Sequence, residues 1–327
     1  MHIIVRSIRG AVPVALGLSL ASFAACSSGE KTGGDSASAA GDSAAAAPAM
    51  FASAGATDSM KTPESVRYDA DLDAYFVSNI NGNPSQRDGN GFIVRIDAGN
   101  TSAVTMVAQG GRKGVTLNAP KGLAIVGDTL WVTDIDVARA FNKRTGATIA
   151  TVDLKPMKAV FLNDAVVGPD GAIYMTDSGI LFDAKGGMTH PGRDQIFKIT
   201  GRKATVAIMG DSVLKSPNGI AWDGANARFV LAPFADNVVT AWKDGDTTVT
   251  PLGTGPGGYD GVEVLADGRT LVTSWADSSV QVMSNGTFRK VIGNVEAPAD
   301  IGVDTKRNVV AVPRFNAGRI EYFTISR

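Results

Sequence analysis

The chain is poor in the residues that build disulfides, zinc sites and strongly charged surfaces. Its 327 residues include one Cys and two His, and charged residues make up only 19% of the sequence. A single Cys cannot form an internal disulfide or a Cys-based zinc site. With 31 Lys and Arg against 32 Asp and Glu, the chain lacks the basic excess that nucleic-acid binding requires. No nucleic-acid partner is therefore expected.

The sequence also lacks an apolar run of the roughly 20 residues that a membrane-spanning helix needs. The apolar run at residues 11–24 is shorter, follows Arg6 and Arg9, and has the length of the hydrophobic part of a signal peptide. Small residues precede the lone Cys26, which resembles a bacterial lipobox with Phe23 in place of the usual Leu. Residues 1–25 are therefore predicted to be a lipoprotein signal peptide, and Cys26 the lipidated membrane anchor. An ordinary secretory peptide is the alternative.

Residues 27–61 are dominated by Ser, Gly, Ala, Thr and Asp, with almost no large apolar side chains. Such a segment buries too little surface to offset its ordering entropy, so residues 26–61 are predicted to form a flexible tether. Ser27 rather than Asp follows Cys26. By resemblance to bacterial lipoproteins, this favours a periplasmic protein of the bacterial cell envelope, held at the outer membrane.

Residues 62–327 contain a repeat and much of the glycine, of which the chain has 38 residues. Each unit reads as an apolar strand, a turn rich in Asp, Gly and Asn, and a second strand, and in four units a third strand follows. The units begin at Pro63, Pro120, Leu162, Pro217, Tyr259 and Pro298, with spacings of 57, 42, 55, 42 and 39 residues. Turns such as Asp267-Gly268 favour tight hairpins.

A period of about 40–45 residues in four-strand units is typical of a β-propeller. The fold is therefore predicted to be all-β, a six-bladed β-propeller, and we expect a monomer. The long spacings place insertions near residues 81–91 and 179–195. The last unit has three good strands, and its fourth is expected from residues just before Pro63, which would close the ring. A linear array of hairpins is the structural alternative.

The residue after the start of each unit forms a second pattern, because the innermost strand of a propeller blade lines the central channel. These positions hold Glu64, Lys121, Asn163, Asn218, Asp260 and Ala299. We call the six positions the ring. Five of the six are polar. Two carboxylates and two amides supply oxygen ligands suited to a hard divalent cation such as Ca²⁺.

Here the chain resembles the gluconolactonase/regucalcin (senescence marker protein) family of six-bladed propellers and their paraoxonase-like relatives. The matching motifs are Pro63-Glu64-Ser65-Val66, Asn163-Asp164, Pro217-Asn218-Gly219 and Asp260-Gly261. The resemblance implies that Glu64, Asn163, Asn218 and Asp260 hold a central divalent cation, Ca²⁺ before Mg²⁺, Mn²⁺ or Zn²⁺. It also implies a small-molecule substrate, a sugar lactone or similar ester.

Lys121 is the departure from this picture, because an ammonium group beside a cation would repel it. Lys121 either turns away or reaches a substrate anion, as Asn163 also could, or it replaces the cation and pairs with Glu64 or Asp260. The second case describes a metal-free propeller like the relatives of strictosidine synthase. A further alternative is a non-catalytic, ligand- or protein-binding propeller of the NHL type.

The chemistry expected of a metal-bearing propeller is ester or lactone hydrolysis, in which a cation polarises the carbonyl and a base activates water. The candidate bases are Asp260 and Asp164. His190, the only His outside the signal peptide, lies in the long insertion and is a third candidate, although an exposed loop His is the simpler interpretation. Four tryptophans lie in or beside apolar strands and are expected in the blade cores; they are Trp131, Trp222, Trp242 and Trp275.

Overall fold

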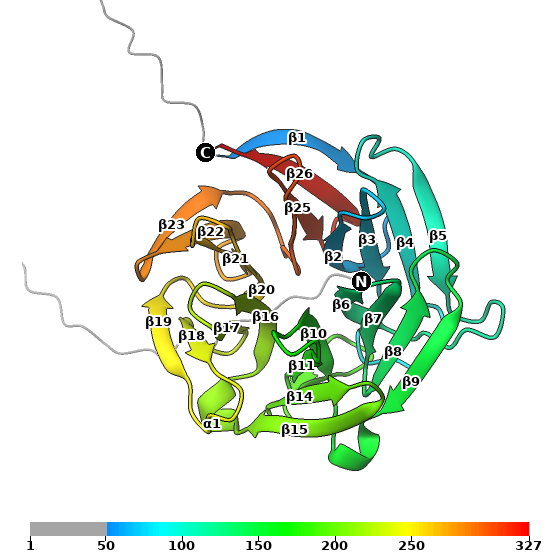
Figure 1. Ribbon diagram of the computed structural model, residues 1–327, viewed down its shortest axis with the longest axis horizontal. Coiled ribbons are helices and arrows are strands. Elements are labelled where there is room, and N and C mark those ends of the chain that lie inside the picture. The colour runs from blue at the N-terminus through cyan, green and yellow to red at the C-terminus, as the bar shows by residue number, and fades with distance from the viewer. Residues whose placement is uncertain (1–50, 327) are drawn as a thin grey trace, which may run out of the picture. The chain divides into compact units, whose positions relative to one another are not determined.

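The computed structural model describes residues 51–326, and within them six four-stranded antiparallel sheets are arranged around a centre as the blades of a propeller (Figure 1). The predicted fold is confirmed. Blade 1 contains β2 (Pro63–Asp69), β3 (Ala74–Asn79), β4 (Phe92–Asp97) and β5 (Val104–Gln109). Blade 2 contains β6 (Pro120–Val126), β7 (Thr129–Asp134), β8 (Val137–Asn142) and β9 (Thr148–Asp153). Blade 3 contains β10 (Leu162–Val167), β11 (Ile173–Asp177), β14 (Gln195–Thr200) and β15 (Lys203–Met209).

The second half of the ring continues in the same way. Blade 4 contains β16 (Pro217–Asp223), β17 (Arg228–Pro233), β18 (Val238–Trp242) and β19 (Thr250–Thr254). Blade 5 contains β20 (Tyr259–Val264), β21 (Thr270–Ser274), β22 (Ser279–Ser284) and β23 (Thr287–Ile292). Blade 6 contains β24 (Gly302–Asp304), β25 (Val309–Arg314), β26 (Arg319–Ile325) and β1 (Phe51–Thr57). The predicted unit starts are the first residues of the inner strands in five blades.

Within the described part of the chain, two short helices and one hairpin lie outside the blades. The 3₁₀-helix η1 (Lys155–Met157) connects blades 2 and 3, and α1 (Asp211–Leu214) connects blades 3 and 4. The hairpin of β12 (Leu181–Phe182) and β13 (Met188–Thr189) fills the predicted insertion between β11 and β14. No helix within residues 51–326 is long and apolar enough to cross a membrane.

Burial falls from the inner to the outer strand of each blade. In blade 1, β3 is wholly buried, whereas β5, at the rim, has only one buried residue (Figure 1). The outer strands therefore carry a weaker apolar signal in the sequence than the buried second strands do.

The ring closes through β1, which pairs antiparallel with β26 from Phe51↔Ile325 to Thr57↔Ile320. The expected closing strand is therefore present, but it lies inside residues 26–61, so the predicted boundary at residue 62 is wrong for the last part of the tether. The reason is that an outermost strand buries little: only Phe51 and Thr57 of β1 are buried. Its small residues therefore resemble a linker. Residues 1–50, with the predicted signal peptide, the start of the tether and Cys26, lie outside the described residues.

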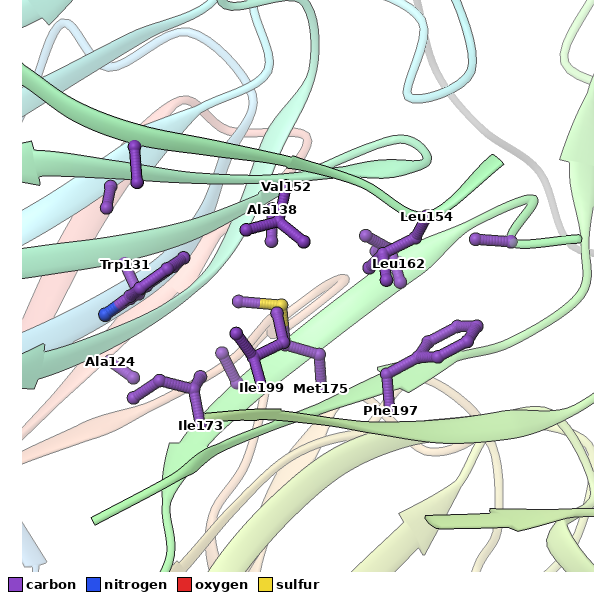
Figure 2. Close-up of a cluster of buried hydrophobic side chains, with 14 residues drawn as sticks. Ala124, Trp131, Ala138, Val152, Leu154, Leu162, Ile173, Met175, Phe197 and Ile199 are labelled. Carbon is purple, nitrogen blue, oxygen red and sulfur yellow. The ribbon is translucent and has the colours of Figure 1, made fainter. Parts of the chain in front are cut away.

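The hydrophobic cores lie between neighbouring blades. Figure 2 shows one of them, in which Trp131 and Val152 of blade 2 face Ile173, Met175 and Phe197 of blade 3. Trp131 and Trp242 are buried in such cores, as expected, and Trp222 is partly buried against one. Trp275 differs, since it follows the end of β21 and packs against Phe234 and Phe315. The cores hold the inner strands in place, and these strands position the ring.

Candidate functional site

The ring positions coincide with an irregularity in the inner strands. In blade 1 the register shifts between Pro63 and Val66, and in blade 3 it shifts between Leu162 and Ala165. The same shift occurs at the start of the inner strand in blades 2, 4 and 5. A β-bulge re-aims side chains, and bulges are frequent beside functional sites. The bulges therefore interrupt regular pairing at the ring residues and the residues that follow them.

Four ring residues are buried and carry oxygen atoms without a hydrogen-bond partner among residues 51–326. The atoms are Glu64 Oε2, Asn163 Oδ1, Asn218 Oδ1 and Asp260 Oδ1. These are the four residues that sequence analysis selected as cation ligands. An unpaired buried oxygen is costly, because its desolvation is uncompensated. Four of them at equivalent positions of four inner strands indicate a place for an electropositive group.

Neighbouring side chains fix how two of these groups point. Asn163 donates from Nδ2 to Ser178 Oγ at 3.1 Å, and Ser178 Oγ in turn donates to Pro217 O at 2.7 Å. This contact turns the amide nitrogen of Asn163 toward Ser178 and leaves Oδ1 free. Burial and the nearby Asp300 raise the pKa of Asp260, whereas hydrogen bonding by the side chains of Trp275 and Asn218 lowers it. Asn218 and Asp260 are thus neighbours.

Electrostatics link Glu64 to the same group. Burial raises the pKa of Glu64 well above its usual value, and Asp260 and Asp300 raise it further, while Lys121 lowers it. Like charges that are held together in a buried place favour protonation or a bound cation. Glu64, Asp260 and Asp300 therefore form one electronegative cluster.

Lys121 lies near Glu64 but hydrogen-bonds to backbone carbonyls. Its Nζ donates to Ala119 O at 3.2 Å and Pro84 O at 3.5 Å, and lies 4.2 Å from the ring centroid of Phe161. Burial lowers the pKa of Lys121 to about 8, although Glu64 opposes the shift. Among residues 51–326 it forms no ion pair with Glu64 or Asp260, the pairing that the metal-free alternative requires.

A second layer of charge lies directly beyond the ring. Arg67 donates from Nη2 to Asp300 Oδ2 at 3.0 Å and to Asp164 Oδ1 at 3.4 Å, and from Nη1 to Glu263. Ser65 Oγ donates to Asp300 Oδ2 at 2.5 Å. We call Arg67, Asp164, Glu263 and Asp300 the Arg67 network. It holds three carboxylates beside the ring with one guanidinium.

This network determines what Asp164 can do. Its Oδ1 accepts hydrogen bonds from Ala165 N at 2.6 Å and from Arg67, and its Oδ2 accepts one from Ile220 N at 2.9 Å. Both oxygens are therefore engaged, whereas Asp260 keeps a free one. Of the two carboxylates considered as bases, Asp260 has the oxygen available.

Sequence analysis missed Arg67 and Glu263, although a signal for them exists. Both occupy the fourth position after the unit start, where the other units have Ala124, Val166, Ala221 and Gly302. Two oppositely charged side chains at a position that is otherwise apolar or small indicate an ion pair between them. Asp300 faces the same network from one residue beyond the ring position.

Glycine follows the ring residue in blades 2, 4 and 5 because adjacent inner strands come very close there. A Cβ atom on Gly122 would lie 2.4 Å from the Asp164 Cα, and one on Gly261 would lie 2.6 Å from the Ile301 nitrogen. Blades 6 and 1 also meet directly, through a parallel bridge between Ser65 and Asp300. The glycines thus allow the inner strands to pack closely around the centre.

His190 lies in the insertion of blade 3, apart from the ring. Its Nε2 is 2.8 Å from Asp194 Oδ1, and Asp194 Oδ2 accepts a hydrogen bond from Ser216 N at 2.5 Å. The hydrogen bond to Asp194 raises the pKa of His190, and its charged neighbours are Asp194 and Asp211. His190 therefore contacts the loop beside α1, and it has no contact with Glu64 or Asp260.

The ring fits a hard cation by the chemistry of its donors. Its free atoms are all oxygens from two carboxylates and two amides, the ligand type that Ca²⁺, Mg²⁺ and Mn²⁺ take. Within residues 51–326, no cluster of three or more His, Cys, Asp or Glu side chains is arranged to hold a metal ion. A site here therefore depends on the two amide oxygens as much as on the carboxylates.

Comparison with known families identifies the family of this propeller. The model of the SMP-30/gluconolactonase/LRE-like region matches residues 62–303. The chain belongs to this family. The family places the chain among lactonase-like propellers and confirms the resemblance carried by the ring motifs. No protein with a curated description matches the chain in sequence.

Solved structures with the same fold include enzymes of different activities. A luciferin-regenerating enzyme is 12% identical with a TM-score of 0.61, and the match covers 83% of this chain and 95% of that one. A gluconolactonase from Xanthomonas campestris is 14% identical with a TM-score of 0.59, covering 82% and 88%. A PQQ-bound aldose sugar dehydrogenase from Streptomyces coelicolor is 15% identical with a TM-score of 0.61, covering 84% and 98%. At these identities the likeness shows the fold alone.

Proposed function

We propose that the protein is a divalent-cation-dependent hydrolase of lactones or esters, with Ca²⁺ as the first candidate ion. The observation that carries the proposal is the set of four buried, unpartnered oxygens on Glu64, Asn163, Asn218 and Asp260. Membership of a lactonase-like family supports the reaction class. A bound cation supplies a Lewis acid that polarises the scissile carbonyl and stabilises the oxyanion.

The side chains of this chain then have separate tasks. Asp260 is the proposed base, because it keeps an unpartnered oxygen, whereas both oxygens of Asp164 accept hydrogen bonds. Asn163 is held by Ser178 with its Oδ1 free toward the ion or the substrate. Lys121 provides a buried ammonium close to Glu64 that can meet negative charge on the substrate. The Arg67 network keeps the second layer of carboxylates paired, so that they do not compete for the ion.

The test is hydrolysis of a panel of lactones and aryl esters by the full chain with Ca²⁺ or with a chelator. We expect turnover that needs the cation and falls by at least 100-fold in Asp260→Asn. A matched control is Asp267→Asn, which alters an exposed carboxylate in a hairpin turn and should leave kcat/KM unchanged. Turnover that survives chelation would refute the metal dependence. Calcium binding without any turnover would instead favour a ligand-binding propeller.

We also propose that the protein is anchored in the bacterial envelope through a lipid on Cys26. The support is the sequence alone, namely a charged start, a short apolar run and small residues before the lone Cys. Intact-mass measurement of the membrane fraction should show an acylated chain beginning at Cys26. Cys26→Ser should release the protein from the membrane. A wild-type chain that carries no acyl mass would contradict the anchor.

A further inference from the structure

A second ring of side chains follows from the register of the blades. It consists of the residue directly after the second strand of each blade, namely Ile80, Ile135, Ser178, Phe234, Trp275 and Phe315. We call these residues the collar. Five of the six are apolar. Since each second strand ends where the inner strand begins, as in Pro233↔Pro217 and Ser274↔Tyr259, the collar lies at the same end of the blades as the ring.

The backbone confirms that the collar positions are equivalent. In five blades, the collar N–H donates to the carbonyl of the residue before the unit start. The donors and acceptors are Ile80 to Thr62 (3.0 Å), Ser178 to Phe161 (3.0 Å), Phe234 to Ser216 (2.9 Å), Trp275 to Gly258 (2.9 Å) and Phe315 to Ala297 (3.1 Å). The collar is thus built into the propeller repeat.

The collar residues contact one another across blades. Trp275 lies 5.5 Å from Phe315 and 5.9 Å from Phe234 between ring centroids. Ile80, Ile135 and Phe315 share one buried apolar cluster, and Trp275 packs against it. Phe182 of the β12–β13 hairpin packs on the same cluster and lies 5.7 Å from Phe161. An apolar surface therefore borders the ring.

The half-buried residues of this surface belong to the blades that supply three of the four unpartnered ring oxygens. Phe182, Phe234 and Trp275 keep partial exposure, whereas Ile80 and Ile135 are buried. The three aromatic residues belong to blades 3, 4 and 5, which also supply Asn163, Asn218 and Asp260. A substrate whose carbonyl lies at a cation held by these oxygens would have its substituent beside the three rings.

Outside the ring, several polar side chains at this end already have partners. Ser178 is bound to Asn163 and Pro217 O, Asn83 donates to Asp183 O at 2.7 Å, and Arg87 pairs with Asp136. The indole N–H of Trp275 interacts with Asp260 and lowers the pKa of that carboxyl. A polyhydroxylated substrate needs a partner for each buried hydroxyl, and this surface offers few.

From these observations we infer that the preferred substrates are lactones or esters with an apolar alkyl or aryl substituent, and that Phe182, Phe234 and Trp275 select them over polyhydroxylated sugar lactones. The inference rests on the proposed hydrolase function. The aromatic rings would contribute by burial of the substituent, so each added methylene is expected to raise kcat/KM about three- to fourfold until the surface is covered.

The test uses the full chain with Ca²⁺ and γ-lactones of increasing alkyl length, with glucono-δ-lactone as the sugar substrate. We expect kcat/KM to rise along the alkyl series and to exceed that of the sugar lactone at least tenfold. Phe234→Ala and Phe182→Ala should flatten the dependence on chain length. Phe323→Ala, which alters a half-buried Phe of the outer part of blade 6, should leave it unchanged. A sugar lactone hydrolysed best, with no dependence on chain length, overturns the inference while the hydrolase stands.

A binding measurement separates this inference from the hydrolase proposal. Calorimetry with octanoate and gluconate, two carboxylates of the product type, requires no turnover. Tighter binding of octanoate than of gluconate, weakened at least tenfold by Phe234→Ala, supports the collar inference. If no substrate in the panel is hydrolysed, that result refutes the hydrolase proposal and leaves the collar inference standing. Equal or tighter binding of gluconate overturns the collar inference.

Discussion

Removing the positive charge of Arg67 is predicted to destabilise the propeller strongly. Arg67 pairs with Asp164, Asp300 and Glu263, and the first two carboxylates are only 1% exposed. Arg67→Met keeps much of the side-chain volume but leaves these carboxylates without their cation. Deleting one partner of a buried ion pair costs about 3–5 kcal/mol. We expect a loss of this size at pH 8, which corresponds to a fall in Tm of about 6 °C or more.

The loss should depend on pH in a defined direction. Burial already raises the pKa of Glu263 to about 7, and it raises those of Asp164 and Asp300, while Arg67 opposes the shift in all three. Without Arg67 these pKa values rise further. A carboxyl with a raised pKa binds its proton more tightly in the folded state, so stability falls as pH rises from the unfolded value toward the folded one. The deficit of Arg67→Met should therefore be smaller at pH 5 than at pH 8.

Urea denaturation followed by tryptophan fluorescence measures both quantities. The matched control is Arg144→Met, because Arg144 pairs with Asp71 and Asp128 on the exposed surface and should change the midpoint little. If Arg67→Met unfolds at the wild-type midpoint, or its deficit is the same at both pH values, the account of a buried network is refuted.

Three further predictions concern the blades and the loops. A chain that starts at residue 62 lacks β1 and leaves β26 as an open edge. It should have a lower Tm and scatter more light than a chain starting at residue 48. Equal Tm values would contradict closure by β1. His190→Gln should lower the free energy of unfolding by up to about 1 kcal/mol at pH 5.5 and by less at pH 8.5. The reason is that a His with a raised pKa stabilises the fold only while it is protonated. A deficit that grows with pH in urea titrations would contradict this. Gly122→Ala should cost about 1–3 kcal/mol through its contact with blade 3, whereas Gly293→Ala, whose new Cβ would meet only Lys290 at 3.7 Å, should be nearly neutral in the same assay.

The repeat could be predicted from the sequence because each unit is specified by residues close together in the chain. Apolar inner strands, Gly-containing turns and the starts of the units give six blades, and the structure has them. The ring residues followed from the same register. The sequence does not separate β1 from the tether, because an edge strand of small residues buries little and so has no strong hydrophobic signal of its own.

The environment of the ring could not be predicted in the same way. The bulges at the starts of the inner strands break the alternation of side chains, so the pattern does not reveal that Arg67 reaches Asp164 and Asp300 in other blades. The direction of Lys121 depends on Pro84 in a distant insertion. Trp275 was expected in a blade core and instead joins the collar, because it lies one residue beyond its strand. These contacts form only when the six blades are assembled.

Calorimetric titration of the full, chelator-treated chain with Ca²⁺ measures directly whether the ring binds a cation. We predict one cation per chain and a rise in Tm, because a ligand at 100 times its Kd stabilises the folded state by about 2.7 kcal/mol. Glu64→Gln and Asp260→Asn should each weaken binding at least tenfold, while Asp267→Asn should bind as the wild type does. Absence of binding heat and of a Tm shift, or binding unchanged in both ring variants, would contradict a cation site at the centre of the propeller.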